Sequence, residues 1–118
     1  MGERMNRVTE KPWGKEILIA HNDCYALKDI HMIAGTRSSL QSHQKKTETI
    51  LVVSGRIRLE HQPPGEAMSV REYGASESYD VAPGTLHRVT VLEDARLIEV
   101  STPELDDVIR HQDDYGRK

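Results

Sequence analysis

Four polar side chains near the middle of the chain have the types and spacing of metal ligands: Gln41, His43, Glu48 and His87. Gln41 and His43 are two residues apart, so they share one face of an extended strand. Glu48 opens an apolar run, and His87 follows the turn at Pro83-Gly84. Two imidazoles, a carboxylate and an amide oxygen form a ligand set that suits a borderline divalent metal ion. The alternative is a metal-free barrel in which these polar side chains bond only one another.

The charge and cysteine content of the chain restrict its partners. The formal net charge of −3 over 118 residues argues against binding of nucleic acid or of an anionic membrane. Cys24 is the only cysteine, which excludes an intramolecular disulfide and agrees with a reducing compartment. The N-terminal residues lack an apolar signal core, and no apolar run approaches the roughly 20 residues that span a bilayer. We therefore expect a cytoplasmic protein.

The elements that must position the four side chains are short β-strands separated by Gly or Pro. The expected strands are Glu16–Ala20, Tyr25–Ile33, Glu48–Ser54, Arg56–Gln62, Ala67–Tyr73, Glu77–Val81, Arg88–Leu92 and Arg96–Thr102. Strands that recur about every 8 to 12 residues predict an all-β sandwich or barrel. A chain of this length corresponds to one domain, residues 1–118.

Three local predictions complete this organisation. Ser54-Gly55 is expected to join two strands as a tight hairpin. Thr102-Pro103-Glu104 has the pattern of a helix N-terminus, so a short helix is predicted over Pro103–His111, within a C-terminal segment 103–118. Residues 1–12 are expected to form a loosely packed N-terminal arm.

Two stretches of the sequence resemble the two motifs of the cupin superfamily. Gly35–Gly55 has the spacing of the first motif, which reads Gly, five residues, His, one, His, four, Glu, six, Gly, with Gln41 in the first His position. Gly74–His87 is similar to the second motif, which ends in a Pro-Gly turn and the last ligand His. The resemblance implies a small cupin barrel, which is a double-stranded β-helix or jelly roll.

Within the cupins, the chain resembles the C-terminal domain of type II mannose-6-phosphate isomerase, which is often fused to a mannose-1-phosphate guanylyltransferase. This closer similarity rests on Lys11-Pro12-Trp13-Gly14, residues 37–43, Leu97-Ile98-Glu99-Val100 and the tail 113–117. In that family Gln, His, Glu and His hold zinc, which implies that the four side chains named above bind one divalent ion. Zinc is the first expectation, with manganese, nickel, cobalt or iron as alternatives.

The resemblance implies an aldose–ketose isomerase that acts on a sugar phosphate such as mannose 6-phosphate. A bound cation would stabilise the developing oxyanion, and a general base is also required. The sequence does not identify this base, and His31 and Glu60 are only candidates from strands that could line the barrel. The cationic side chains expected to bind the phosphate are Arg37, Lys45, Lys46, Arg88 and Arg117.

Two other functions stay open at this point. One is a non-catalytic, metal-containing cupin that binds a sugar or nucleotide-sugar for a neighbouring enzyme. The other is a metal-dependent cupin enzyme of different chemistry, such as an oxygenase or another sugar isomerase or epimerase. Small cupins commonly pair through their sheet edges, which must otherwise be covered, so a homodimer is expected.

Overall fold

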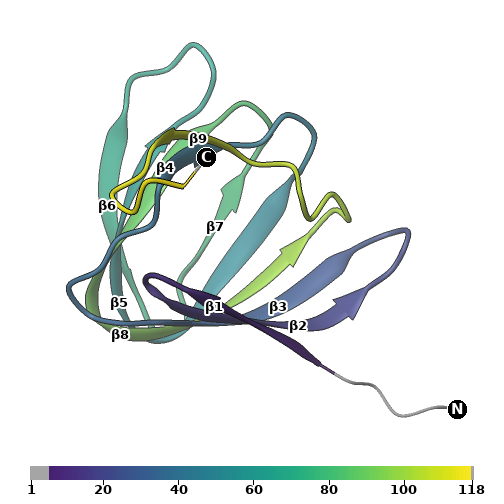
Figure 1. Ribbon diagram of the computed structural model, residues 1–118. Helices are drawn as coiled ribbons and strands as arrows, with labels where there is room; N and C mark the ends of the chain where they lie inside the picture. The colour runs from purple at the N-terminus through teal and green to yellow at the C-terminus, as the bar shows by residue number, and fades with distance from the viewer. Residues whose placement is uncertain (1–5, 118) are drawn as a thin grey trace, which may run out of the picture.

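The protein is described by a computed structural model over residues 6–117, and that range contains nine β-strands (Figure 1). The strands are β1 (Arg7–Lys11), β2 (Gly14–His21), β3 (Ala26–Met32), β4 (Leu40–Ser42), β5 (Glu48–Gln62), β6 (Ser69–Gly74), β7 (Ser78–Val81), β8 (Leu86–Ser101) and β9 (Ile109–Gln112). All of their pairings are antiparallel. Among the described residues, no helix is long and apolar enough to cross a membrane.

The long strands β5 and β8 connect the two halves of the barrel. They pair along their whole length, from Glu48 opposite Ser101 to Gln62 opposite Leu86. The second half of β8 continues through β3 and β2 to β1, and the first half of β5 pairs with β7. The first half of β8 pairs with β4 and then β9, while the second half of β5 pairs with β6. Both long strands therefore pass from one sheet to the other, and the whole curls into an open barrel (Figure 1).

The hairpin predicted at Ser54-Gly55 is wrong, because β5 runs through this point without reversing. The pairing with β8 shifts register on both sides of Ser54, as at a β-bulge. Gly55 has a φ of +83°, and a Cβ there would lie 2.1 Å from the backbone oxygen of Asp94. Only glycine allows that approach. The residue therefore bends the strand from one sheet into the other.

Apolar side chains from both sheets fill the interior. The buried apolar cluster comprises Trp13, Ile30, Met32, Ile50, Val52, Ile57, Leu59, Tyr73, Tyr79, Val81, Val89, Val91, Ala95 and Leu97. The inward side chains alternate with outward ones along each strand. Ile50 and Val52 are buried, for example, whereas Leu51 between them is exposed. This packing holds the two sheets face to face and fixes where the polar inward residues can meet.

The predicted C-terminal helix over Pro103–His111 is also wrong. The segment makes turns up to residue 108 and then forms β9, which pairs with β4. The Asp107 carboxylate accepts hydrogen bonds from the backbone N–H groups of Gln44, Lys45 and Lys46. A helix of this length is marginal by itself, so these tertiary bonds decide the conformation.

The N-terminal arm is more ordered than the sequence indicates. Residues 7–11 of the predicted arm form β1, in continuous register with β2 from Arg7 opposite Leu18 to Lys11 opposite Gly14. Residues 1–5 of the predicted arm lie outside the described residues. The hairpin of β1 and β2 extends one sheet and brings Lys11 toward the end of the barrel where the polar residues gather.

Candidate metal centre

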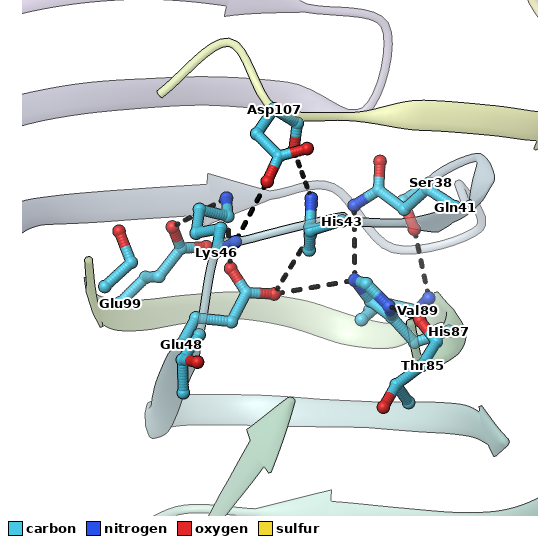
Figure 2. A network of polar contacts seen from close by, with 12 residues as sticks. Ser38, Gln41, His43, Lys46, Glu48, Thr85, His87, Val89, Glu99 and Asp107 are labelled. Atoms are coloured by element: carbon cyan, nitrogen blue, oxygen red, sulfur yellow. Dashed lines mark hydrogen bonds and ion pairs between the residues drawn. The ribbon is translucent and has the colours of Figure 1, made fainter. Parts of the chain in front are cut away.

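Three of the four expected ligands meet inside the barrel (Figure 2). His43 follows β4, Glu48 begins β5, and His87 lies at the start of β8. Nε2 of His43 is 3.6 Å and Nε2 of His87 is 3.5 Å from the same oxygen, Oε1 of Glu48. One ligand atom from each residue lies within 4.8 Å of the other two, and all three side chains are buried. A single cation can therefore be reached by all three.

Backbone carbonyls orient both imidazole rings. Nδ1 of His43 donates to the carbonyl of Asp107, and Nδ1 of His87 donates to the carbonyl of Thr85 at 3.0 Å. A carbonyl only accepts, so Nδ1 carries the proton and Nε2 keeps its lone pair on each ring. Nε2 of His43 is buried without a hydrogen-bond partner among the described residues. A buried lone pair without a donor, facing a carboxylate oxygen, fits a bound cation.

Gln41 stands beside this cluster. It is opposite His87 in the pairing of β4 with β8, and its Nε2 lies 3.5 Å from Nε2 of His87. Its Oε1 accepts a hydrogen bond from the Ser39 hydroxyl at 3.0 Å. Only the amide oxygen can ligate a cation, so ligation requires a half-turn of the amide. The Ser39 hydroxyl can accept from the amide nitrogen after that turn.

Lys46 joins Glu48 to a second buried carboxyl group, that of Glu99 (Figure 2). Its Nζ lies 3.2 Å from Oε2 of Glu48 and 3.7 Å from Oε2 of Glu99. Burial opposes ionisation of Glu48, but the adjacent rings of His43 and His87 and the charge of Lys46 hold its pKa well below the ordinary value. Burial and the charge of Glu48 raise the pKa of Glu99 to about 8. The site thus combines an ionised carboxylate with a carboxyl group that retains its proton near neutral pH.

A cavity of about 110 Å³ is lined by Gln41, His43 and Glu48 and is here named the metal cavity. It is strongly charged. Its cationic lining residues are Lys11, Lys28, Lys46, Arg110 and Arg117. Its acidic lining residues are Glu16, Glu48 and Glu99. Trp13, Leu105 and Val108 supply an apolar wall. Eight charged side chains around so small a space suit a small, highly polar ligand.

Sequence comparison relates the chain to one family. Residues 2–113 match the family described as mannose-6-phosphate isomerase C-terminal. The chain belongs to this family. It is 36% identical over 121 residues to mannose-1-phosphate guanylyltransferase ManC of Salmonella typhimurium strain LT2, and 33% identical over 122 residues to mannose-1-phosphate guanylyltransferase of Escherichia coli strain K12. These alignments cover 96% and 97% of the chain but only 24% of each relative, so the chain spans about a quarter of their length.

Solved structures confirm the predicted cupin barrel. KdgF from a Halomonas species superposes with a TM-score of 0.73 at 19% identity, over 85% of this chain and 90% of that one. Oxalate decarboxylase of Bacillus subtilis, which has Mn(II) centres, superposes with a TM-score of 0.78 at 12% identity, over 90% and 30%. The capsular polysaccharide assembling protein CapF of Staphylococcus aureus gives 0.71 at 18% identity, over 93% and 35%. At these identities the likeness establishes the fold alone.

The structure does not bring the predicted phosphate-binding cations together. Lys46 and Arg117 line the metal cavity, whereas Arg37, Lys45 and Arg88 do not. Arg37 pairs with Asp114 and Arg117 pairs with Asp113. Arg88 donates to the carbonyls of Ser38 and Gln112, and the Lys45 side chain is exposed. Three of the five side chains therefore lie away from the cavity.

The candidate bases His31 and Glu60 also lie outside the metal cavity. His31 lines a different hollow, where its Nε2 lies 3.3 Å from Oδ1 of Asp29. Glu60 is opposite Arg88 in the pairing of β5 with β8, on the face away from the buried Leu59. Glu99 was not identified from the sequence, although a carboxyl group inside the apolar run Leu97–Val100 is a signal of a buried functional group.

Proposed function

We propose that this domain is a metal-dependent isomerase that interconverts an aldose phosphate, such as mannose 6-phosphate, with the corresponding ketose phosphate. The observation that carries the proposal is the convergence of His43, Glu48 and His87 on one point, with a buried lone pair on His43 that has no other donor. Membership of the mannose-6-phosphate isomerase C-terminal family supports the reaction class.

The proposed ligands are His43, Glu48 and His87, with Gln41 as a fourth after its amide turns. Nitrogen and carboxylate donors without a thiolate suit zinc, and they also accept manganese, nickel, cobalt or iron. A bound divalent cation would supply Lewis-acid polarisation of a substrate oxygen. The Nδ1 bonds to the carbonyls of Asp107 and Thr85 keep both rings in the tautomer that ligation needs.

The proposed isomerisation moves a proton between C1 and C2, so a group on the cavity wall must take it up and return it. Glu99 is the best-placed carboxyl group that is not itself a proposed ligand. It lines the cavity, and its Oε2 has no hydrogen-bond partner among the described residues. The ammonium group of Lys46 lies between Glu99 and Glu48 and offsets the repulsion between the two carboxyl groups. We assign the proton transfer on this geometry to the ionised form of Glu99, and because its pKa is about 8, the isomerisation rate should rise with pH toward that value.

The test is a screen of aldose and ketose phosphates against the zinc-loaded protein in D₂O. Solvent deuterium should enter C1 or C2 of the substrate, and the aldose and ketose signals should interconvert in the proton NMR spectrum. Glu99→Gln should abolish exchange while zinc content stays unchanged, and Glu93→Gln on the exposed part of β8 is the matched control. Absence of both exchange and interconversion across the screen would end the isomerase proposal.

The second candidate function is a non-catalytic module that binds a sugar or nucleotide-sugar. It is favoured by the relatives, which are named as guanylyltransferases and of which this domain matches only 24%. Binding of a sugar phosphate in calorimetry, with no deuterium exchange in any substrate, would select this function.

We further propose that the domain is a homodimer formed at a sheet edge. β1 pairs only with β2, and β6, β7 and β9 each have a single partner strand, so four strands have an edge without a strand partner among the described residues. Such edges are sites of strand addition. Light scattering on a sizing column should give a mass of about twice 13.4 kDa, and a monomer mass at high concentration would refute the dimer.

A further inference from the structure

A second hollow continues outward from the metal cavity. It has a volume of about 190 Å³ and shares four lining residues with the cavity: Lys11, Glu16, Lys28 and Leu105. Arg7 and Thr9 of β1 line its outer part. A ligand that reaches the cluster of His43, Glu48 and His87 at one end therefore lies against β1, β2 and β3 at the other, beside the loop at Leu105. The cationic residues Lys11 and Lys28 lie where the two hollows join.

Lys11 differs from the other cations of the cavity in making no ion pair among the described residues. The described residues give its side chain neither an ion pair nor a hydrogen bond, whereas Lys28 lies 3.2 Å from Oε1 of Glu16. Arg117 is held by Asp113 in two side-chain hydrogen bonds. A half-buried ammonium group without a partner is costly unless an anion neutralises it.

The surroundings of Lys11 make its charge more costly still. Burial is the main cause that lowers the pKa of Lys11; the charge of Glu16 opposes it, and the charges of Lys28, Arg110 and Arg117 add to the lowering. Three positive side chains thus face a fourth across one hollow. An excess of cations around an open space is the arrangement that attracts an anionic ligand.

The fold holds Lys11 in this place. The β1–β2 hairpin turns at Pro12-Trp13, with Lys11 paired to Gly14. The Trp13 side chain is buried in the core and also lines the metal cavity. Its carbonyl accepts a hydrogen bond from the N–H of Ile33, which follows β3. The hairpin is therefore anchored at its turn, immediately beside the ammonium group.

We infer that Lys11 and Lys28 form an anion subsite that binds the phosphate of a ligand whose other end reaches the cluster of His43, Glu48 and His87. The inference rests on the proposed function, since it supposes a sugar phosphate in the same cavity. Lys11 and Lys28 take the place of Arg37, Lys45 and Arg88 as the proposed phosphate-binding cations, because the latter three lie outside the metal cavity. The ligand class is a phosphomonoester with hydroxyl or carbonyl oxygens at the opposite end. A doubly charged phosphate matches two ammonium groups.

The experiment compares Lys11→Ala with Lys15→Ala in the zinc-loaded protein by isothermal titration calorimetry. Lys15 is exposed on the same hairpin, two positions beyond the turn residue Trp13. It lines the separate hollow that contains His31. The probes are mannose 6-phosphate, mannose and inorganic phosphate. Lys11→Ala should weaken mannose 6-phosphate and inorganic phosphate by about tenfold or more, as expected for a lost charged hydrogen bond. Lys15→Ala should bind mannose 6-phosphate and inorganic phosphate like the unaltered protein. The binding of mannose and the zinc content should be the same in all three proteins.

The outcomes separate this subsite from the proposed function. If mannose 6-phosphate binds equally to Lys11→Ala and Lys15→Ala, the subsite is refuted while the isomerase proposal stands. If the metal-loaded protein shows no isomerisation but inorganic phosphate binding still depends on Lys11, the subsite stands and the isomerase proposal falls. Lys11→Gln removes the charge and keeps a polar side chain that is one atom shorter, and it should reproduce the loss if charge is the cause. Full phosphate affinity in folded Lys11→Gln would overturn the inference.

Discussion

Two hollows of the barrel, one lined by His31 and the other by His43, differ in how the charges around them are satisfied. The larger, about 480 Å³, is lined by His31 and Arg96, and both side chains contact Asp29, which lies 3.3 Å from His31 and accepts two hydrogen bonds from Arg96. The smaller, about 110 Å³, contains His43 with a buried Nε2 that has no partner among the described residues. Cavity size therefore does not mark the site in this fold. A buried polar atom without a partner, Nε2 of His43, marks it.

The largest expected effect comes from removing one histidine on each side of this comparison. His87→Ala should lower zinc affinity by more than the roughly 10–100-fold seen when outer-shell partners are lost, because a ligand atom itself disappears. Its melting temperature should then no longer rise with added zinc. His31→Ala should keep both the zinc content and the zinc-dependent rise. Elemental analysis and thermal melts measure the two properties, and equal zinc dependence in the two variants would break the distinction.

A smaller effect is expected from the cations that neutralise the acidic groups. Lys46→Met leaves Glu48 and Glu99 buried without their counter-charge, so the free energy of unfolding should fall by about 3–5 kcal/mol. Arg96→Met removes the partner of Asp29, but that guanidinium is 49% exposed and its loss should change stability little. Urea unfolding in the presence of a chelator measures both. Similar losses in the two variants would show that burial does not separate the hollows.

The smallest effect concerns acid stability. Hydrogen bonds from Arg117 hold the pKa of Asp113 at about 2 in the folded protein, below the ordinary 3.8. A lowered folded pKa adds stability above the ordinary value, and this stability is lost as pH falls toward the folded value. The free energy of unfolding should therefore decline between about pH 4 and pH 2. Asp113→Asn should flatten this decline in urea titrations, as should Asp29→Asn, whose carboxyl pKa is also lowered, mainly by Arg96. An unchanged pH profile in Asp113→Asn would contradict the assigned cause.

Sequence patterns could predict the barrel and the residues that converge at its centre, but not the residues around them. Motif spacing identifies His43, Glu48 and His87, because each lies beside a turn or strand end that the motif itself defines. Lys11 and Glu99 escape such reasoning, since their meeting depends on how β1, β2, β3 and β8 are paired. Local composition does not determine the register between strands that are far apart in the sequence.

The two wrong local predictions have the same origin. The Pro103–His111 segment has a helix-start pattern, but Asp107 is bound by the backbone of residues 44–46, which are distant in sequence. Gly55 has the freedom that a hairpin needs, yet the paired strand β8 uses that freedom for a bulge. In both places a long-range contact overrides a local preference, as it commonly does in β-proteins.

The long pairing of β5 with β8 has a consequence for the order of events during folding. Glu48 and His87 lie toward opposite ends of this ribbon, with Glu48 opposite Ser101 and His87 opposite His61. They come together only when the bent ribbon has closed, and pairings so distant in sequence form slowly. An ion that needs both residues cannot bind before that closure. Zinc should therefore leave the refolding rate unchanged and slow the unfolding rate, so that the metal sets the lifetime of the barrel rather than the speed of its assembly.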